Sequence, residues 1–262
     1  MTPKLKKREW GKDPYFYGPR QYFRQTLLVN DIKKNKIVKK NRSMNARSKI
    51  KVLDAGCGNG SLSFRLAKEG MNITGIDITK DNIDFSNNVK NKLKIDNINF
   101  KKMSITNIKL PKNSFDIIIS SEVLEHIEDD NKAVKELNKV LKKGGECIIS
   151  VPYNPKLWSL EDKWVGHKRR YTYRKLRKLL VKNGFKVNNI KCMGFPLLRI
   201  YFALFRFFIL KKKVKEGKVT KQSVLFQNIN KLVSYVFFLD TLFDSKKLGI
   251  GLIVRAKKIK NI

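Results

Sequence analysis

The most informative stretch of the chain is Lys49-Ile-Lys-Val-Leu-Asp54, which runs directly into Ala55-Gly-Cys-Gly-Asn-Gly60. Its first half is a short apolar run ending in an acid, which is typical of a buried strand. The glycines at 56, 58 and 60 permit a tight turn and let a ligand approach the backbone closely. Residues 61–69 then show apolar side chains at helical spacing. A strand, a glycine loop and a helix in this order predict a ligand site beyond the carboxyl end of the strand.

A second acid lies at a distance that suits a nucleotide site. Asp77 ends the next predicted strand, residues 72–77, and follows Gly60 by 17 residues. A carboxylate there can accept hydrogen bonds from both hydroxyls of a ribose. The loop differs from the dinucleotide fingerprint GxGxxG, because Ser61 stands where that pattern has its last glycine. The chain also lacks the GxxxxGKS or GxxxxGKT loop of phosphate-binding proteins.

Further strands and helices alternate on both sides of this stretch. The apolar patterns predict strands at 98–103, 115–120 and 146–151, helices at 80–93 and 131–141, and a helix end at Gly144-Gly145. They also predict a helix from Arg20 to Lys39, a helix from Tyr173 to Asn183, and a last strand from Gly249 to Lys257. This alternation indicates an α/β fold with a Rossmann-like, doubly wound, mostly parallel sheet.

The charge of the chain is unevenly distributed. Of 262 residues, 58 are Lys or Arg and 22 are Asp or Glu, which gives a net charge of +36. Residues 51–152 contribute only +2, whereas residues 1–50 contribute +12 and residues 153–262 contribute +22. Two basic arms favour an anionic partner, either a nucleic acid or a membrane surface. The alternative explanation for the number of lysines is the compositional drift of an AT-rich genome, which does not explain why residues 51–152 lack the excess.

Cysteine and histidine contents narrow the class of protein further. Three cysteines without a CxxC pair do not form a disulfide framework, and with only two histidines we expect no metal site. The N-terminus is lysine-rich and has no apolar run, so no secretory signal is expected. We therefore expect a cytoplasmic protein, with a peripheral position at the inner face of the membrane as one possibility.

Four motifs, in order and correctly spaced, resemble the class I S-adenosylmethionine-dependent methyltransferases. They are VLDAGCGNG at 52–60, GID at 75–77, NSFDIIISSEVLEHIED at 113–129 and LKKGGECIISVP at 141–152. Together they cover residues 50–155. Within the family, the chain is most similar to the small-molecule group that includes the ubiquinone-biosynthesis O-methyltransferases. The resemblance implies S-adenosyl-L-methionine as the cofactor and methyl transfer as the activity.

The resemblance also implies which residues bind the cofactor. Matching the family's motifs position by position, the implied set is Asp54, Gly56, Cys57, Gly58, Asp77, Ile78, Ser104, Ile105, Ser121 and Glu122. In this set Asp54 and the glycines hold the methionine part, Asp77 binds the ribose and Ile78 flanks the adenine. Ser104 departs from the family, which usually has an acid where the adenine edge is read. Cys57 is interpreted as a small filler of the turn, with a reactive thiol as the alternative.

Both histidines are candidates for a general base. Such a base is needed only if the acceptor arrives protonated and weakly acidic. His126 lies just past the fourth predicted strand, where a structural role in the loop is the alternative. His167 lies in the stretch GHKRRYT at 166–172, whose Arg169, Arg170 and Tyr171 are predicted to bind an anionic acceptor. A basic surface turn is the alternative for this stretch.

The C-terminal arm contains two aromatic-rich helical segments. Residues 195–210 and 224–243 are strongly apolar, and Lys211-Lys-Lys213 follows the first of them. Two interpretations stay open: amphipathic helices on a membrane surface, or helices that pack on the pocket or on a second subunit. We therefore divide the chain into a basic N-terminal helical cap (1–48), a cofactor-binding core (49–155) and an acceptor-side region (156–262) with amphipathic helices at about 194–243.

Three functions compete on this reading. The first is methyl transfer to a small-molecule or lipid-linked acceptor, with both arms roofing the pocket. The second is methylation of RNA or another nucleic acid, but the chain has no NPPY-like tetrapeptide after the fourth strand and no recognisable RNA-binding module. The third is a non-catalytic binding protein with a methyltransferase fold. The sequence leaves the oligomeric state open.

Overall fold

The computed structural model describes residues 18–41, 43–205, 224–243 and 248–262. Seven strands form one sheet in the order β3-β2-β1-β4-β5-β7-β6. Their bounds are β1 Lys51–Ala55, β2 Asn72–Asp77, β3 Ile98–Lys102, β4 Phe115–Ser121, β5 Leu141–Pro152, β6 Phe185–Met193 and β7 Gly251–Lys258. The first five strands are parallel, and β7 runs antiparallel to both β5 and β6. The predicted doubly wound α/β sheet is confirmed.

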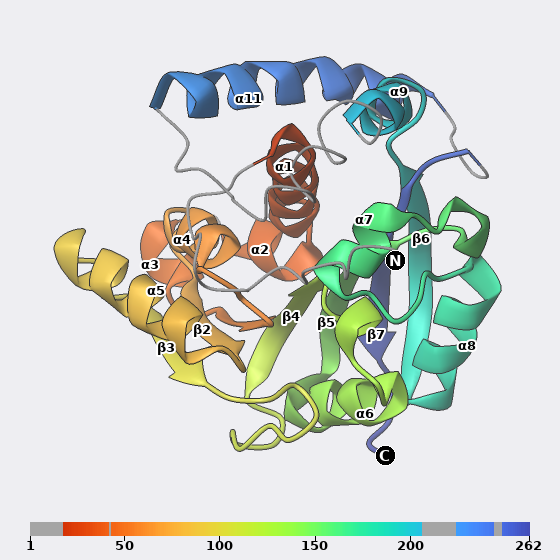
Figure 1. The fold of residues 1–262 in the computed structure, drawn as a ribbon. Helices are drawn as coiled ribbons and strands as arrows, with labels where there is room; N and C mark the ends of the chain where they lie inside the picture. The colour runs from red at the N-terminus through yellow and green to blue at the C-terminus, as the bar shows by residue number, and fades with distance from the viewer. Residues whose placement is uncertain (1–17, 42, 206–223, 244–247) are drawn as a thin grey trace.

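Helices cover both faces of the sheet (Figure 1). The bounds are α1 Pro19–Lys33, α2 Lys36–Lys40, α3 Met44–Arg47, α4 Ser61–Ala67, α5 Lys80–Lys92, α6 Asp130–Val140, α7 Leu160–Val165, α8 Tyr173–Lys182, α9 Leu197–Phe205 and α11 Val224–Val236. Short 3-10 helices are η1 Leu124–His126, η2 Pro155–Leu157 and η4 Phe237–Leu242. Helices α1, α4 and α5 contribute to the core on one face, and α6 and α8 to the core on the other.

The helix predicted over residues 20–39 is interrupted. Helix α1 ends at Lys33, and Asn35 caps the next helix, α2. The Asn35 side-chain oxygen accepts the backbone N–H of Ile37 at 2.8 Å. The Asn35 amide also donates to Glu146 Oε2 of β5 at 2.8 Å. An asparagine that can bond the backbone locally favours a cap over a helix interior, so the break follows from a residue present in the sequence.

Strand β5 is longer than predicted. Helix α6 ends at Val140, and the strand already begins at Leu141. Gly144 and Gly145 were expected to end the helix, but they lie inside the strand. A side chain at Gly145 would place its Cβ 2.9 Å from the backbone oxygen of Asp116. The glycine therefore permits close approach of two strands rather than a helix end.

Strand β6 was absent from the sequence prediction, and the helices α9, α11 and η4 lie between it and β7. Met193 at the end of β6 is the register partner of Gly251 at the start of β7. The aromatic-rich helices expected at about 194–243 are thus, as far as the structure describes them, an insertion between these two strands. In the parts of the chain that the structure describes, none of the helices combines the length and hydrophobicity needed to cross a bilayer.

A small third core attaches this insertion to the N-terminal helix. It contains Phe23 of α1, Leu198 and Phe202 of α9, Phe237 of η4 and Ile250. Phe23 also contacts the ring of Phe238 edge-on at a centroid distance of 5.1 Å. The two arms of the chain thus meet above the carboxyl ends of the parallel strands. Trp10, Tyr15, Phe16 and Tyr17 of the N-terminal arm, residues 206–210 of the first predicted tail helix and Lys211–Lys213 lie outside the described residues.

Candidate active site

A cavity of about 420 Å³ opens at the carboxyl ends of β1, β2 and β4. Its floor is the glycine loop after β1 and the ends of the neighbouring strands, and its roof comes from α1, α7 and α9. Twelve predicted site residues lie in its wall: Asp54, Gly56, Cys57, Gly58, Asp77, Ile78, Ser104, Ile105, Ser121, Glu122, His126 and His167. The structure thus brings together residues from five separate stretches of the sequence, at 54–58, 77–78, 104–105, 121–126 and 167.

The glycine loop is shaped by positions that exclude a side chain. Gly56 has a φ of +82°, and a Cβ there would lie 2.4 Å from Cγ2 of Val123. Gly60 has a φ of +75° and stands at the N-terminus of α4. Gly58, by contrast, has no atom within 4 Å of the place where its Cβ would stand. Its backbone therefore borders open cavity, which suits close approach of a ligand.

Asp77 connects the end of β2 to this loop. Its Oδ2 accepts the backbone N–H of Gly58 at 2.9 Å, and its Oδ1 accepts that of Thr79 at 2.8 Å. The carboxylate is thereby fixed at the cavity wall with lone pairs left over for a ligand. The next side chain, Ile78, is 68% exposed beside the cavity.

Asp54 lies deeper and is 2% exposed. Its Oδ2 accepts a hydrogen bond from the hydroxyl of Ser63 at 2.7 Å. Burial, with a smaller contribution from the charge of Asp77, raises the pKa of Asp54 to about 6. A buried carboxylate of this kind gains most from a cationic ligand that compensates its lost hydration.

Cys57 and Ser104 have local partners. Burial raises the pKa of the Cys57 thiol well above its ordinary value, so the thiol stays protonated, as the filler interpretation requires. The Ser104 hydroxyl lies 2.9 Å from the hydroxyl of Thr106 and accepts the Thr106 backbone N–H. Ile105 beside it is buried in the wall.

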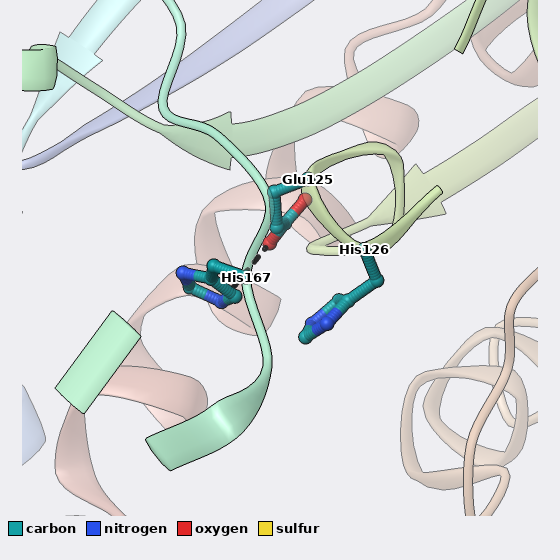
Figure 2. Close-up of side chains that lie close together, drawn as sticks. All are labelled: Glu125, His126 and His167. Atoms are coloured by element: carbon teal, nitrogen blue, oxygen red, sulfur yellow. Dashed lines mark ion pairs between the residues drawn. The ribbon is translucent and has the colours of Figure 1, made fainter. Parts of the chain in front are cut away.

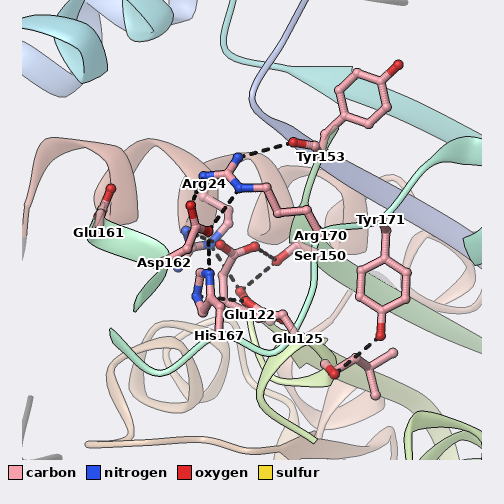
Figure 3. Close-up of polar contacts among 12 residues, drawn as sticks. Arg24, Glu122, Glu125, Ser150, Tyr153, Glu161, Asp162, His167, Arg170 and Tyr171 are labelled. Atoms are coloured by element: carbon pink, nitrogen blue, oxygen red, sulfur yellow. Dashed lines mark hydrogen bonds and ion pairs between the residues drawn. The ribbon is translucent and has the colours of Figure 1, made fainter. Parts of the chain in front are cut away.

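The end of β4 is joined to the N-terminal helix by a charged pair. Arg24 of α1 places Nη1 3.4 Å from Oε2 of Glu122, and its Nε donates to the hydroxyl of Ser121 at 3.2 Å (Figure 3). Burial opposes ionisation of Glu122, but Arg24 and Arg20 outweigh it and lower the pKa of this carboxyl. The pair holds α1 across the cavity mouth.

His167 is oriented by a buried carboxylate. Its Nδ1 lies 2.7 Å from Oδ1 of Asp162, and Arg170 donates to both Asp162 oxygens at 2.9 Å (Figure 3). Burial favours the protonated form of Asp162, but the hydrogen bonds with His167 and Arg170 outweigh this effect and hold the pKa of Asp162 well below its usual range. An ionised Asp162 favours a proton on Nδ1, which leaves the Nε2 lone pair of His167 available at the cavity.

Glu125, His126 and His167 form a cluster that the sequence did not predict (Figure 2). One ligand atom from each lies within 4.8 Å of the others, and Nε2 of His167 is 3.8 Å from Oε1 of Glu125. Glu125 is fully buried, and neither of its carboxylate oxygens accepts a hydrogen bond from any described residue. Burial and the nearby Glu122 raise the pKa of Glu125 well above its ordinary value. One carboxylate and two imidazoles form a donor set that could hold a divalent cation, so the expectation of no metal site is reopened.

Arg169, Arg170 and Tyr171 do not reach the cavity wall. Arg170 is 5% exposed and is fully engaged with Asp162 and the backbone oxygen of Tyr153. Arg169 pairs with Asp130 at 2.9 Å, and the buried hydroxyl of Tyr171 donates to the same carboxylate at 2.8 Å. Their placement does not support the prediction that these residues bind an acceptor. The pattern GHKRRYT could not show this, because their partners lie elsewhere in the chain.

The sequence did not predict the individual residues of the roof. They are Arg20, Gln25, Glu161, Trp164, Val165, Tyr201 and Phe202. Arg20 places Nη2 3.3 Å from Oε1 of Glu161, which links α1 to α7 across the cavity. The sequence predicts that both arms cover the pocket, but periodicity does not reveal which side chains point inward.

Comparison with known proteins adds to this geometry. A family model described as a methyltransferase domain matches residues 46–192. The chain belongs to this methyltransferase family. The match covers the glycine loop, Asp77, the end of β4 and His167.

Curated relatives are similar over part of the chain. A ubiquinone biosynthesis O-methyltransferase of Pelagibacter ubique is 42% identical over 103 residues, which are 38% of this chain and 41% of that protein. The Rickettsia bellii protein of the same name is 34% identical over 129 residues, which are 47% of this chain and 50% of that protein. The chain thus spans half or less of the length of these relatives.

Solved structures share the fold at low identity. The [4+2]-cyclase SpnF has a TM-score of 0.62 at 17% identity, covering 97% of this chain and 86% of its own. Phosphoethanolamine N-methyltransferase 2 of Haemonchus contortus, solved in complex with S-adenosyl-L-methionine, has a TM-score of 0.59 at 17% identity, covering 93% and 58%. A cyclase and a methyltransferase on one fold show that the site, rather than the fold, carries the chemistry.

Proposed function

We propose that this protein transfers a methyl group from S-adenosyl-L-methionine to a hydroxyl of a small-molecule or lipid-linked acceptor. The observation that carries the proposal is the carboxylate of Asp77, fixed by the glycine loop at the wall of a cavity in a chain of the methyltransferase family. The names of the curated relatives support oxygen as the acceptor atom.

The chain's own residues are suited to hold each part of the cofactor. Asp77 accepts the ribose hydroxyls, Ile78 covers the adenine, and Asp54 compensates the ammonium of the methionine part. The open backbone at Gly58 gives the ligand room. Bound there, the cofactor supplies an activated methyl group on its sulfonium. The protein then has to align an acceptor with that methyl group and exclude water.

His167 is the proposed general base. Asp162 holds Nδ1 of His167, a residue that lines the cavity, so that Nε2 is left to take the proton of an acceptor hydroxyl as the methyl group is transferred. Glu161, Tyr201 and Phe202 of the roof then form the acceptor side of the cavity. His126 stacks edge-on against His167 at a centroid distance of 4.7 Å and keeps that ring in place.

We propose that this reaction takes place in the cytoplasm, beside an anionic membrane surface. The surplus of positive charge on the two arms supports that placement.

A label-transfer experiment tests the activity. The protein is incubated with methyl-labelled cofactor and separate lipid, metabolite and RNA fractions, and we expect label in a lipid or metabolite fraction. Label confined to RNA would contradict the proposal.

The raised pKa of Asp54 predicts a pH-dependent affinity for the cofactor. Protonation of Asp54 removes the charge that faces the ligand's ammonium, so affinity should fall about tenfold per pH unit below pH about 6. Calorimetric titrations at pH 5 and pH 7 measure this. Asp54→Asn should bind weakly at both values, because it cannot ionise. A wild-type affinity that stays constant across this range would show that Asp54 does not face the ligand's charge.

The same shift predicts a gain in stability from Asp54→Asn. The folded-state pKa of Asp54 lies above its unfolded value of 3.8, so its contribution to stability is full below that value and is lost as the pH rises through about 6. At pH 7 the unliganded variant should therefore melt at a higher temperature than the wild type. Asp96→Ala, at an exposed position, serves as the control; an unchanged melting temperature in Asp54→Asn would contradict the prediction.

The cluster of Glu125, His126 and His167 predicts binding of a divalent cation. Dialysis against Zn²⁺, followed by elemental analysis, should find about one ion per chain. Glu125→Gln keeps the buried volume but removes the carboxylate, and should lose the ion. Glu128→Gln, three residues away and exposed, is the matched control. If both variants retain as much zinc as the wild type, the cluster holds no cation and the Nε2 lone pair of His167 is free for the base role. An ion bound to Nε2 would occupy that lone pair and exclude His167 as the base.

A further inference from the structure

Helix α11 and the following η4 form the outer edge of the molecule, on the far side of α1 from the sheet (Figure 1). Their outward surface, here called the α11 face, consists of large apolar side chains. Its members are Ile229, Leu232, Tyr235, Val236, Leu239, Leu242 and Phe243, each at least 47% exposed. Leu232 and Leu242 reach 68% and 79%. An apolar face of this size on a water-exposed helix indicates a surface that is covered in use.

The inward side of α11 holds polar residues beside Val233, which packs against the third core. Asn230 and Ser234 are 8% and 0% exposed, and the hydroxyl of Ser234 donates to the backbone oxygen of Lys231. A helix on the surface of a globular protein normally turns its apolar stripe inward and its polar residues to water. In α11 Asn230 and Ser234 point toward the protein together with Val233, whereas Ile229, Leu232 and Val236 point away from it. The helix thus leaves a large part of its apolar surface outside, which indicates an apolar medium there.

The charge of this part of the chain favours an anionic medium. Asp240 is the only acid in the sequences of α9, α11 and η4, and it is 3% exposed. Both its oxygens are used inside the protein, where they accept the backbone N–H groups of Leu197 and Leu198 at 2.8 and 3.0 Å. Lys231 lies exposed at the edge of the face. In the sequence, residues 194–243 contain nine Lys or Arg and two acids, of which the structure describes Arg199, Lys231 and Asp240.

We propose that the α11 face docks on an anionic lipid bilayer. Apolar side chains that enter the interfacial layer and lysines that remain among acidic head groups are the two contributions that such docking requires. A second copy of the chain fits less well, because each copy carries a net charge of +36 and two copies repel each other. Docking of this face does not depend on the proposed methyl transfer. The inference about the acceptor that follows from docking rests on that function.

The docked face lies directly above the roof of the cavity. Tyr235 contacts Tyr22 of α1 edge-on at 6.3 Å, and the next turns of α1 carry Arg20 and Arg24 into the cavity wall. Helix α9 likewise presents Tyr201 and Phe202 to the cavity while Ile200 and Leu204 stay exposed. One layer of helices therefore separates a docked bilayer from the site. The acceptor is accordingly a molecule with an apolar tail that resides in the bilayer.

A vesicle flotation assay tests the docking. Vesicles of phosphatidylcholine with about 30% phosphatidylglycerol are compared with pure phosphatidylcholine at about 0.15 M salt. The full chain should float with the anionic vesicles and bind the neutral ones at least about tenfold less. Leu232→Ser, Leu239→Ser and Leu242→Ser combined should reduce anionic binding by about tenfold or more.

A matched triple variant controls for the loss of exposed apolar residues. Leu93→Ser, Val181→Ser and Ile259→Ser change side chains that are 49–56% exposed on other parts of the molecule, and should float like the wild type. Both triple variants should bind the cofactor in calorimetry as the wild type does, because none of the six residues lines the cavity.

Two outcomes would overturn the inference. In one, the wild type ignores anionic vesicles, or the α11-face variant floats as well as the wild type. In the other, sedimentation shows a wild-type dimer that the α11-face variant reduces to a monomer, which makes the face an interface between copies. Failure of the methyl-transfer proposal looks different, since the cofactor would then give no binding heat while vesicle binding persists.

Discussion

Replacing His167 with alanine should lower turnover by about a hundredfold or more and leave the cofactor affinity nearly unchanged. The side chain lies at the cavity with Nδ1 held by Asp162, so its loss removes the group that takes the acceptor's proton. The binding loop and Asp77 lie on other elements and keep their geometry. Steady-state kinetics with calorimetry on the same preparation separates the two effects.

Lys168→Ala is the matched control for this substitution. Lys168 is the next residue, and it pairs with Glu128 at the surface rather than at the cavity. Zinc content is measured in parallel, because His167 also belongs to the candidate cation cluster. Asp162→Asn should lower turnover as well, because it removes the carboxylate that orients the imidazole of His167 while the imidazole itself is retained. Full activity of His167→Ala would remove the residue as the base.

Asp77→Ala should weaken cofactor binding by about a hundredfold, roughly 3 kcal/mol. The carboxylate is the proposed acceptor for two ribose hydroxyls, and it also fixes the Gly58 and Thr79 backbone groups. Both the direct bonds and the preformed loop are lost together, so the effect should exceed that of any single neutral hydrogen bond. Calorimetry with the cofactor and with its demethylated product measures it.

Asp96→Ala provides the comparison, because it removes an acid from an exposed loop of the same domain. A melting curve of Asp77→Ala shows whether the loop change also destabilises the fold. Wild-type affinity in the Asp77 variant would refute the assignment of the cofactor site. A loss of affinity in both variants would point to general charge effects instead.

The floor of the site could be predicted from the sequence because it is built from local patterns. A strand, three glycines with defined spacing and a strand-ending acid fix Gly56, Gly58 and Asp77 relative to each other before any long-range packing is known. Parallel strands then bring the ends of β1, β2 and β4 to one edge of the sheet. Residues that depend on this geometry alone were placed in the cavity wall.

The roof and the supporting network could not be predicted, because they depend on contacts across the chain. Arg24 reaches Glu122 nearly a hundred residues away, and nothing in its local sequence marks it as a wall residue. Arg170 looked like an anion ligand, yet its partner Asp162 lies on the preceding helix and buries it. Glu125 belonged to a recognised motif, but only its burial and missing partners reveal it as a candidate ligand.

The pairing of Met193 with Gly251 indicates where a helical insertion can enter this fold during evolution. The two strands that flank it are antiparallel neighbours whose ends already meet, so a short hairpin turn could join them without disturbing the sheet. The segment between these ends is therefore separable from the sheet, although Phe202 and Phe237 pack it against Phe23 of α1. A lineage could exchange it at one point of the chain, changing the roof of the cavity and the outer surface while the glycine loop and Asp77 stay in place.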